Sequence, residues 1–156
     1  SFSLAYFELS DFADRTAAQT LINASEFSDS FGVQFYGTFG VEINGNNVPH
    51  VGWFQNDNFV TYSQVNFLAP GATKGILLRY AKKSAGGSIE VRLEGPTGQL
   101  LAEFVPINRS SWSDFADVWV ELDAEVDGIH DLTFLGKGDG YIFNLESFSI
   151  REAPPL

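Results

Sequence analysis

Residues 128–150 read GIHDLTFLGKGDGYIFNLESFSI, and this stretch decides how the rest of the sequence is interpreted. Two apolar runs flank the glycine-rich residues 136–140, a pattern that predicts two strands joined by a tight turn. In the second run, alternation predicts that one face carries Tyr141, Phe143 and Leu145, and the opposite face Ile142, Asn144 and Glu146. Asn144 then lies among large apolar residues just after a turn. Its amide either satisfies loop backbone or faces a ligand, and the stretch alone leaves both roles open.

Short apolar runs of the same kind recur along the chain. They predict strands at residues 2–12, 21–27, 33–41, 59–67, 75–82, 88–94, 99–105 and 117–122. Turn signals separate them, among them the polar residues 28–30 and the Asn44-Gly45 dipeptide of a hairpin at residues 41–48. Residues 13–20 are the one helix candidate, with Asp14 as its cap. Many short strands with almost no helical period predict an all-β fold, an antiparallel β-sandwich of the jelly-roll type.

The length of 156 residues suits a single domain with a sizeable core. We expect residues 21–150 to form the sandwich and residues 1–20 to be an extra strand or a linker. Residues 151–156, REAPPL, are typical of a linker remnant, which predicts a module of a longer protein.

The charge of the chain restricts its partners. With 20 acidic and 9 basic residues, the net charge is −11. Nucleic acid, anionic membranes and heavily sulfated polymers would be repelled, so we expect a neutral partner. The absence of cysteine excludes disulfides, thiolate chemistry and cysteine metal sites. No apolar run is long enough to span a membrane.

Catalytic patterns are weak. His50 and His130 are far apart in sequence, and no serine lies in a nucleophile-elbow motif. A pair of carboxylates remains an open alternative, because acidic residues are plentiful. Aromatic residues in loops are more informative: Trp53 and Trp112 are either lids over the core or flat platforms for a ligand. Trp119, in a regular strand, is expected in the core or on the sheet surface.

Four segments resemble the family 6 carbohydrate-binding modules, in the same order along the chain. Residues 51–63, VGWFQNDNFVTYS, resemble the family's VGYIDNGDWVSYS, and residues 88–98, SIEVRLEGPTG, resemble TIEVRLDGPTG. Residues 128–132, GIHDL, are similar to GVHDL, and residues 140–148, GYIFNLESF, are similar to GYLFNLDWF. The resemblance implies a secreted, non-catalytic β-sandwich that binds glycans and is tethered, as a monomeric module, to a polysaccharide-degrading enzyme.

The family's site residues carry over to particular positions. The resemblance implies that Trp53 and Trp112 clamp a sugar ring in a cleft at the loop end, with Asn144 as its hydrogen-bonding anchor. Tyr36 falls where many members carry a glutamate. This assignment agrees with physical chemistry, because sugar rings expose apolar C–H faces that stack on indole rings, while their hydroxyls need amide partners.

Departures from the family pattern affect two further sites. Phe59 replaces a tryptophan that forms a second cleft in some members, with an acidic residue near Glu94. The family's calcium-binding EAED reads NASE at residues 23–26, so the expected structural calcium would use Asn23, Ser25 and Glu146. The hairpin at residues 41–48 lengthens the chain before Trp53, and we expect it to shape one wall of the cleft.

The ligand is the most open point. Acidity and the resemblance together favour a neutral marine polysaccharide, agarose or laminarin (a β-1,3-glucan), with the parent protein an agarase or laminarinase. Xylan or cellulose binding is the alternative, as is a protein-adhesion module without sugar binding. A few such contacts predict roughly −4 to −8 kcal/mol, or millimolar to micromolar affinity. A single end-on cleft would favour chain ends.

Overall fold

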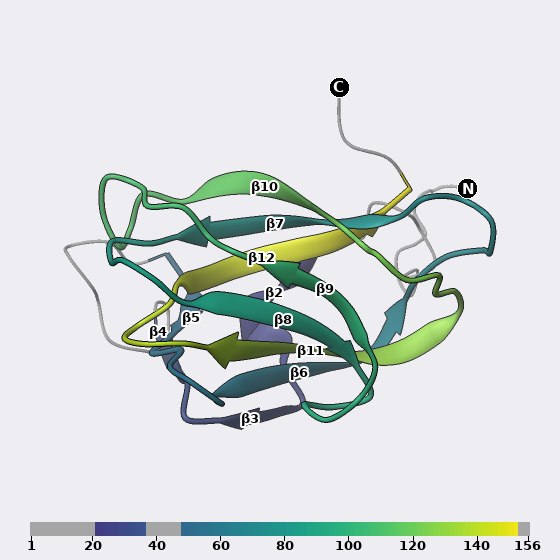
Figure 1. Cartoon of the computed structure of the whole chain (residues 1–156), viewed down its shortest axis with the longest axis horizontal. Helices are drawn as coiled ribbons and strands as arrows, with labels where there is room; N and C mark the ends of the chain where they lie inside the picture. The colour runs from purple at the N-terminus through teal and green to yellow at the C-terminus, as the bar shows by residue number, and fades with distance from the viewer. Residues whose placement is uncertain (1–20, 37–47, 153–156) are drawn as a thin grey trace.

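Two antiparallel sheets packed face to face make up the described part of the chain (Figure 1). The computed structural model describes residues 21–36 and 48–152. One sheet has the order β10-β7-β12-β5-β4, with β2 also paired to β12, and the other has the order β3-β6-β11-β8-β9. The bounds are β2 Ile22–Asn23, β3 Asp29–Phe31, β4 Gln34–Tyr36, β5 His50–Gly52, β6 Phe59–Asn66, β7 Gly75–Ala81, β8 Ser88–Leu93, β9 Leu100–Phe104, β10 Ala116–Glu121, β11 Ile129–Lys137 and β12 Asn144–Arg151. The predicted antiparallel β-sandwich is confirmed.

The core lies between the sheets and is rich in aromatic rings. Alternating residues of β7 and β8 point inward, as their sequence pattern predicts. In the middle, the ring of Phe148 packs edge-on against Tyr62 and Phe134, with centroids 4.9 Å and 5.1 Å apart. Edge-to-face pairs of this kind add to the stabilisation from burial. The core thus holds both sheets rigidly beneath the loops that they carry.

Two predictions near the start of the described chain are wrong in detail. Residues 21–27 form only the short β2 and then a 3-10 helix, Ala24–Glu26. The cause is a capping box, in which the backbone N–H of Asn23 donates to the carboxylate of Glu26 at 3.1 Å. Residues 28–30, predicted as a turn, lie partly in β3, because pairing with the edge of β6 outweighs local turn preference.

The prediction for the second strand of the opening stretch is also partly wrong. Strand β12 begins at Asn144, since Gly138 and Gly140 have φ values of 100° and 73° and extend the turn. Tyr141 and Phe143 therefore precede the strand and do not share a face: Tyr141 is 42% exposed and Phe143 is buried. A register shift between residues 145 and 147 changes the alternation further.

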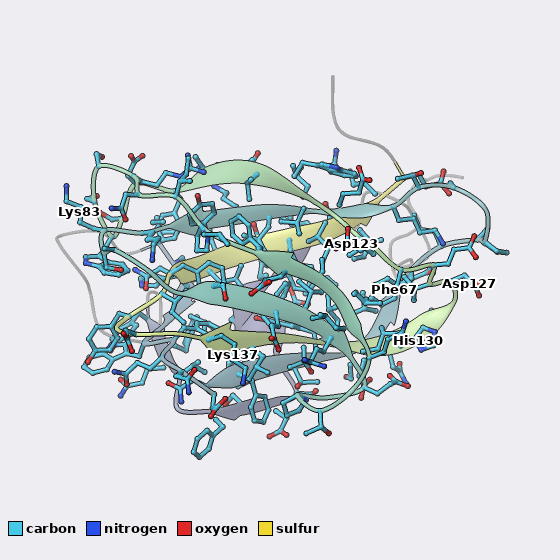
Figure 2. All side chains as sticks on the ribbon, in the orientation of Figure 1. Phe67, Lys83, Asp123, Asp127, His130 and Lys137 are labelled. Atoms are coloured by element: carbon cyan, nitrogen blue, oxygen red, sulfur yellow. The ribbon has the colours of Figure 1, made fainter. Side chains whose placement is uncertain are left out.

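Loops 53–58, 82–87, 105–115 and 138–143 gather at one end of the sandwich, here called the loop end. Backbone hydrogen bonds join them, from Arg109 N–H to the Lys82 carbonyl at 2.9 Å and from Ile142 N–H to the Phe54 carbonyl at 2.8 Å. Figure 2 shows Lys83 at this end, and Asp127 and His130 at the other. The Lys82 Nζ also donates to the Ile142 carbonyl at 2.7 Å, so the four loops form one connected unit.

Several expectations fall outside the described residues: the strand at residues 2–12, the helix at 13–20, the hairpin at 41–48 and most of the end segment 151–156. Among the residues that are described, none belongs to a helix long and apolar enough to cross a membrane.

Candidate functional site

Trp53 stands at the loop end, directly after β5. Its side chain is 43% exposed, and its backbone has φ of 67°, in the left-handed region. That conformation costs a non-glycine residue roughly 1–3 kcal/mol and persists only where the surroundings impose it. The strand before Trp53 and the contacts around it therefore hold the indole in an orientation that the chain would not adopt by itself.

Asn144 is the first residue of β12 and lies beneath the loops. Its side chain is 5% exposed, and its Nδ2 donates to the backbone carbonyl of Trp112 at 2.8 Å. Its Oδ1 faces Gly52, where a Cβ atom would lie only 2.6 Å away. Glycine at position 52 is what leaves room for this amide. Asn144 thus touches the residue before Trp53 and the backbone of Trp112.

Trp112 lies in loop 105–115 and is half-buried. The loop is braced at Asp114, whose carboxylate accepts hydrogen bonds from the Ser110 N–H at 3.1 Å and the Ser110 hydroxyl at 2.8 Å. These two bonds lower the pKa of Asp114 below its usual value. Three residues before Trp112, the guanidinium of Arg109 lies over the buried ring of Tyr80 at 4.5 Å. These contacts hold the loop that contains Trp112 at several points.

Tyr36 and His50 lie behind the exposed aromatic residues. Tyr36 is 5% exposed, donates to the side chain of Gln34 at 3.0 Å and stacks on His50 with centroids 5.5 Å apart. Burial raises the pKa of Tyr36, and a hydrogen bond with the Trp53 side chain partly offsets this. Tyr36 therefore contacts the Trp53 side chain through this hydrogen bond, and only a small part of Tyr36 reaches the surface.

His50 is buried between two rings, those of Tyr36 and Phe115, each with a centroid 5.5 Å from its own. Its Nδ1 lies 2.7 Å from the Val48 carbonyl, so Nδ1 carries the proton and donates. Within the described part of the chain, its Nε2 has no hydrogen-bond partner. Burial lowers the pKa of His50, which keeps the ring neutral near pH 7.

The two residues expected at a second cleft are far apart. Phe59 pairs with Leu135 on β11 and stacks on Phe31, while the Glu94 carboxylate accepts from the N–H of Asp131 at 2.8 Å. Residues 131 and 135 are four positions apart on one strand, about 13 Å at the usual rise of roughly 3.3 Å per residue. The structure does not bring Phe59 and Glu94 together.

The residues expected to hold calcium fit that ion poorly. Calcium takes six to eight oxygen ligands. Asn23 pairs in register with Ser147 and so lies next to Glu146, but the Glu146 carboxylate already accepts from the Arg79 Nε at 2.9 Å. Ser25 is exposed in the 3-10 helix. In residues 21–36 and 48–152, no three His, Cys, Asp or Glu side chains gather as metal ligands.

Sequence reasoning missed Tyr141, which lies against Trp53 with ring centroids 5.3 Å apart at 77°. The available signal was Gly140, whose left-handed φ of 73° takes the next residue out of the strand. The loop end thus brings together the aromatic pair of Trp53 and Tyr141 and an Asn144 amide that is bonded to the backbone of Trp112 and lies against Gly52, the residue before Trp53. Exposed flat rings together with a fixed amide can bind a ring that is apolar on its faces and polar at its edges.

Known proteins have sequences similar to this one. Residues 23–152 match the family model described as carbohydrate binding module (family 6). The chain is also 31% identical over 139 residues to endo-1,4-beta-xylanase A of Thermoclostridium stercorarium, a match that covers 85% of this chain and 25% of the xylanase. The chain therefore spans about a quarter of the length of that relative.

Solved structures share the fold. A family 6 carbohydrate-binding module from Clostridium cellulolyticum, in complex with xylose, is 29% identical with a TM-score of 0.72, over 86% of this chain and 98% of that one. A β-1,3-glucan-binding module of the same family from Bacillus halodurans is 28% identical with a TM-score of 0.70, over 86% and 96%. The chain belongs to family 6 of the carbohydrate-binding modules, a family of non-catalytic carbohydrate-binding domains found in glycoside hydrolases.

Proposed function

We propose that the loop end binds a neutral polysaccharide, β-1,3-glucan or agarose, and thereby holds an attached, secreted glycoside hydrolase at its substrate. Trp53 and Trp112 clamp a sugar ring, and Asn144 anchors its hydroxyls. The observation that carries this proposal is the position of Asn144, which donates to the Trp112 carbonyl at 2.8 Å and packs on Gly52, next to Trp53. One buried amide thus connects both clamp residues.

Electrostatics support a neutral ligand. The net charge of −11 would repel a heavily sulfated galactan at low ionic strength, whereas an uncharged chain meets no such barrier. Stacking of about 0.5–1.5 kcal/mol per ring and hydrogen bonds of similar size add to a modest total. We expect millimolar to micromolar dissociation constants, that is, roughly −4 to −8 kcal/mol.

Xylan or cellulose is the second candidate, and it has specific support. The Clostridium cellulolyticum module is in complex with xylose, and the similar Thermoclostridium stercorarium protein is an endo-1,4-beta-xylanase. Against this, the Bacillus halodurans module of nearly the same similarity binds β-1,3-glucan. Modules of nearly equal similarity thus bind different sugars, so similarity to them does not choose the ligand.

Titration calorimetry tests the proposal. The protein and its Trp112→Ala variant are titrated with neoagaro-, laminari-, xylo- and cello-oligosaccharides. Binding of the laminari or neoagaro series, lost in the variant, is the expected result. Selective binding of the xylo or cello series would replace the ligand assignment, and no binding in folded protein would favour protein adhesion. Oligosaccharides capped at their non-reducing ends should bind more weakly, because an end-on site needs a free chain end.

A further inference from the structure

Tyr141 is an exposed aromatic residue that the proposed clamp leaves unused. Of the aromatic side chains in residues 21–36 and 48–152, three are exposed: Phe31, Trp53 and Tyr141. Two of these, Trp53 and Tyr141, touch each other, with an interplanar angle of 77°, and remain 43% and 42% exposed. Large apolar rings left in contact at a surface indicate a binding role. The pair forms a right-angled aromatic corner.

The segment that carries Tyr141 is anchored by a buried cation. Lys82 is 2% exposed, and its Nζ donates to the Ile142 carbonyl at 2.7 Å, the Gly86 carbonyl at 2.9 Å and the Ser84 hydroxyl at 3.2 Å. Ser84 in turn donates to the Tyr141 carbonyl at 2.5 Å. All three ammonium donors are used, as the burial of a charge requires.

This anchor makes the corner rigid before any ligand arrives. The carbonyls of residues 141 and 142 are both held from loop 82–87, and the Ile142 N–H donates to the Phe54 carbonyl, next to Trp53. The backbone segments that carry Trp53 and Tyr141 are therefore joined to each other by hydrogen bonds. A ligand that contacts both rings loses little affinity to ordering them.

We propose that Tyr141 forms a second sugar subsite beside Trp53, and that the right angle selects glycans that turn between successive sugars. This inference rests on the proposed function, whose clamp supplies the first subsite. In β-1,4-linked ribbons, neighbouring rings lie close to one plane, so a sugar stacked on Trp53 would direct the edge of its neighbour at Tyr141. A turned linkage, as in β-1,3-glucan or agarose, presents the apolar face of that neighbour instead.

The test compares ligand lengths in the Tyr141→Ala and Tyr141→Phe variants by chemical-shift titration. The wild-type protein should gain affinity from glucose to laminaribiose, with a smaller gain from glucose to cellobiose. In Tyr141→Ala, the laminaribiose affinity should fall roughly two- to tenfold while glucose is unaffected. Tyr141→Phe should keep most of the affinity, because the ring stacks.

Two controls separate the possible failures. Phe31→Ala removes another exposed aromatic, 62% exposed on β3, and should change no affinity. Trp112→Ala should abolish binding of every length; binding that survives this change refutes Trp112 as part of the proposed clamp, whereas the dependence on ligand length in Tyr141→Ala tests the second subsite by itself. Suppose that Trp112→Ala abolishes binding. If Tyr141→Ala then lowers the affinities for glucose and laminaribiose equally, or lowers neither affinity, Tyr141 is not a second subsite. An equal loss with cellobiose would refute the preference for turned chains.

Discussion

Replacing Gly52 by alanine tests the geometry of the site without removing any ligand-binding side chain. A Cβ atom at this position would lie 2.6 Å from Oδ1 of Asn144, where ordinary contact begins at 3.4 Å. Either the amide or strand β5 must therefore shift by about 0.8 Å, the difference between these two distances. If the amide moves by this distance away from the Trp112 carbonyl, the 2.8 Å hydrogen bond between Nδ2 and that carbonyl lengthens beyond hydrogen-bonding distance.

Both stability and affinity should fall. Overpacking a buried site of this kind costs about 1–3 kcal/mol, so urea unfolding should show a lower midpoint with an unchanged slope. If the displaced Oδ1 can no longer accept a hydrogen bond from a sugar hydroxyl, the loss of about 0.5–1.5 kcal/mol corresponds to a roughly two- to twelvefold larger dissociation constant. Calorimetry with the ligand series identified for the wild-type protein measures the second effect.

A double-mutant cycle shows whether the effect passes through Asn144. The Asn144→Ala variant removes the amide that the new methyl group would meet, so Gly52→Ala should cost almost nothing further in that background. We expect a coupling free energy of about 1 kcal/mol or more in urea unfolding. Additive losses of stability, or unchanged affinity in folded Gly52→Ala protein, would refute the proposed contact.

Two further predictions concern protonation and metal binding. Burial lowers the pKa of His50 below 6.5, so the stability that the neutral ring contributes is complete above about pH 6.5 and is lost as the pH falls toward the lowered pKa. His50→Phe keeps the ring stack, and its stability relative to wild type should improve from pH 7.5 to pH 5 in urea unfolding; an unchanged difference contradicts this. For the calcium expectation, EDTA should leave the melting temperature unchanged, because Arg79 already pairs with Glu146; a clear drop would show that calcium binds.

The sequence predicted the long strands well and the short ones badly. In β7 and β8, one face is buried, so apolar and polar side chains alternate over six or seven residues, and this alternation is visible in the sequence. Strand β3 has three residues, is exposed or half-buried along its length, and exists because the edge of β6 offers it backbone partners. That partner is distant in sequence, so local composition indicated a turn.

The candidate site was predicted by residue type, and its arrangement was not. The resemblance of sequence motifs alone indicated Trp53, Trp112 and Asn144, but it did not indicate that Tyr36 lies buried against His50. Nor could alternation place Tyr141, because the left-handed glycine before it rotates the chain out of the strand. Loop residues are positioned by contacts between segments far apart in sequence, and periodicity carries no information about those contacts.

Of the two roles left open for Asn144, the structure shows the structural one, and the ligand-facing role stays a prediction that the other end of the amide allows. Its Nδ2 satisfies loop backbone at the Trp112 carbonyl, which is the structural role. Since the amide group is planar, that bond also fixes where Oδ1 points, and a ligand acceptor is useful only when its direction is fixed. The structural bond of Asn144 is thus what would make it a precise anchor for a sugar hydroxyl, and the same bond ties the position of Trp112 to that anchor. Affinity and order of the Trp112 loop should therefore change together in any variant that moves this amide.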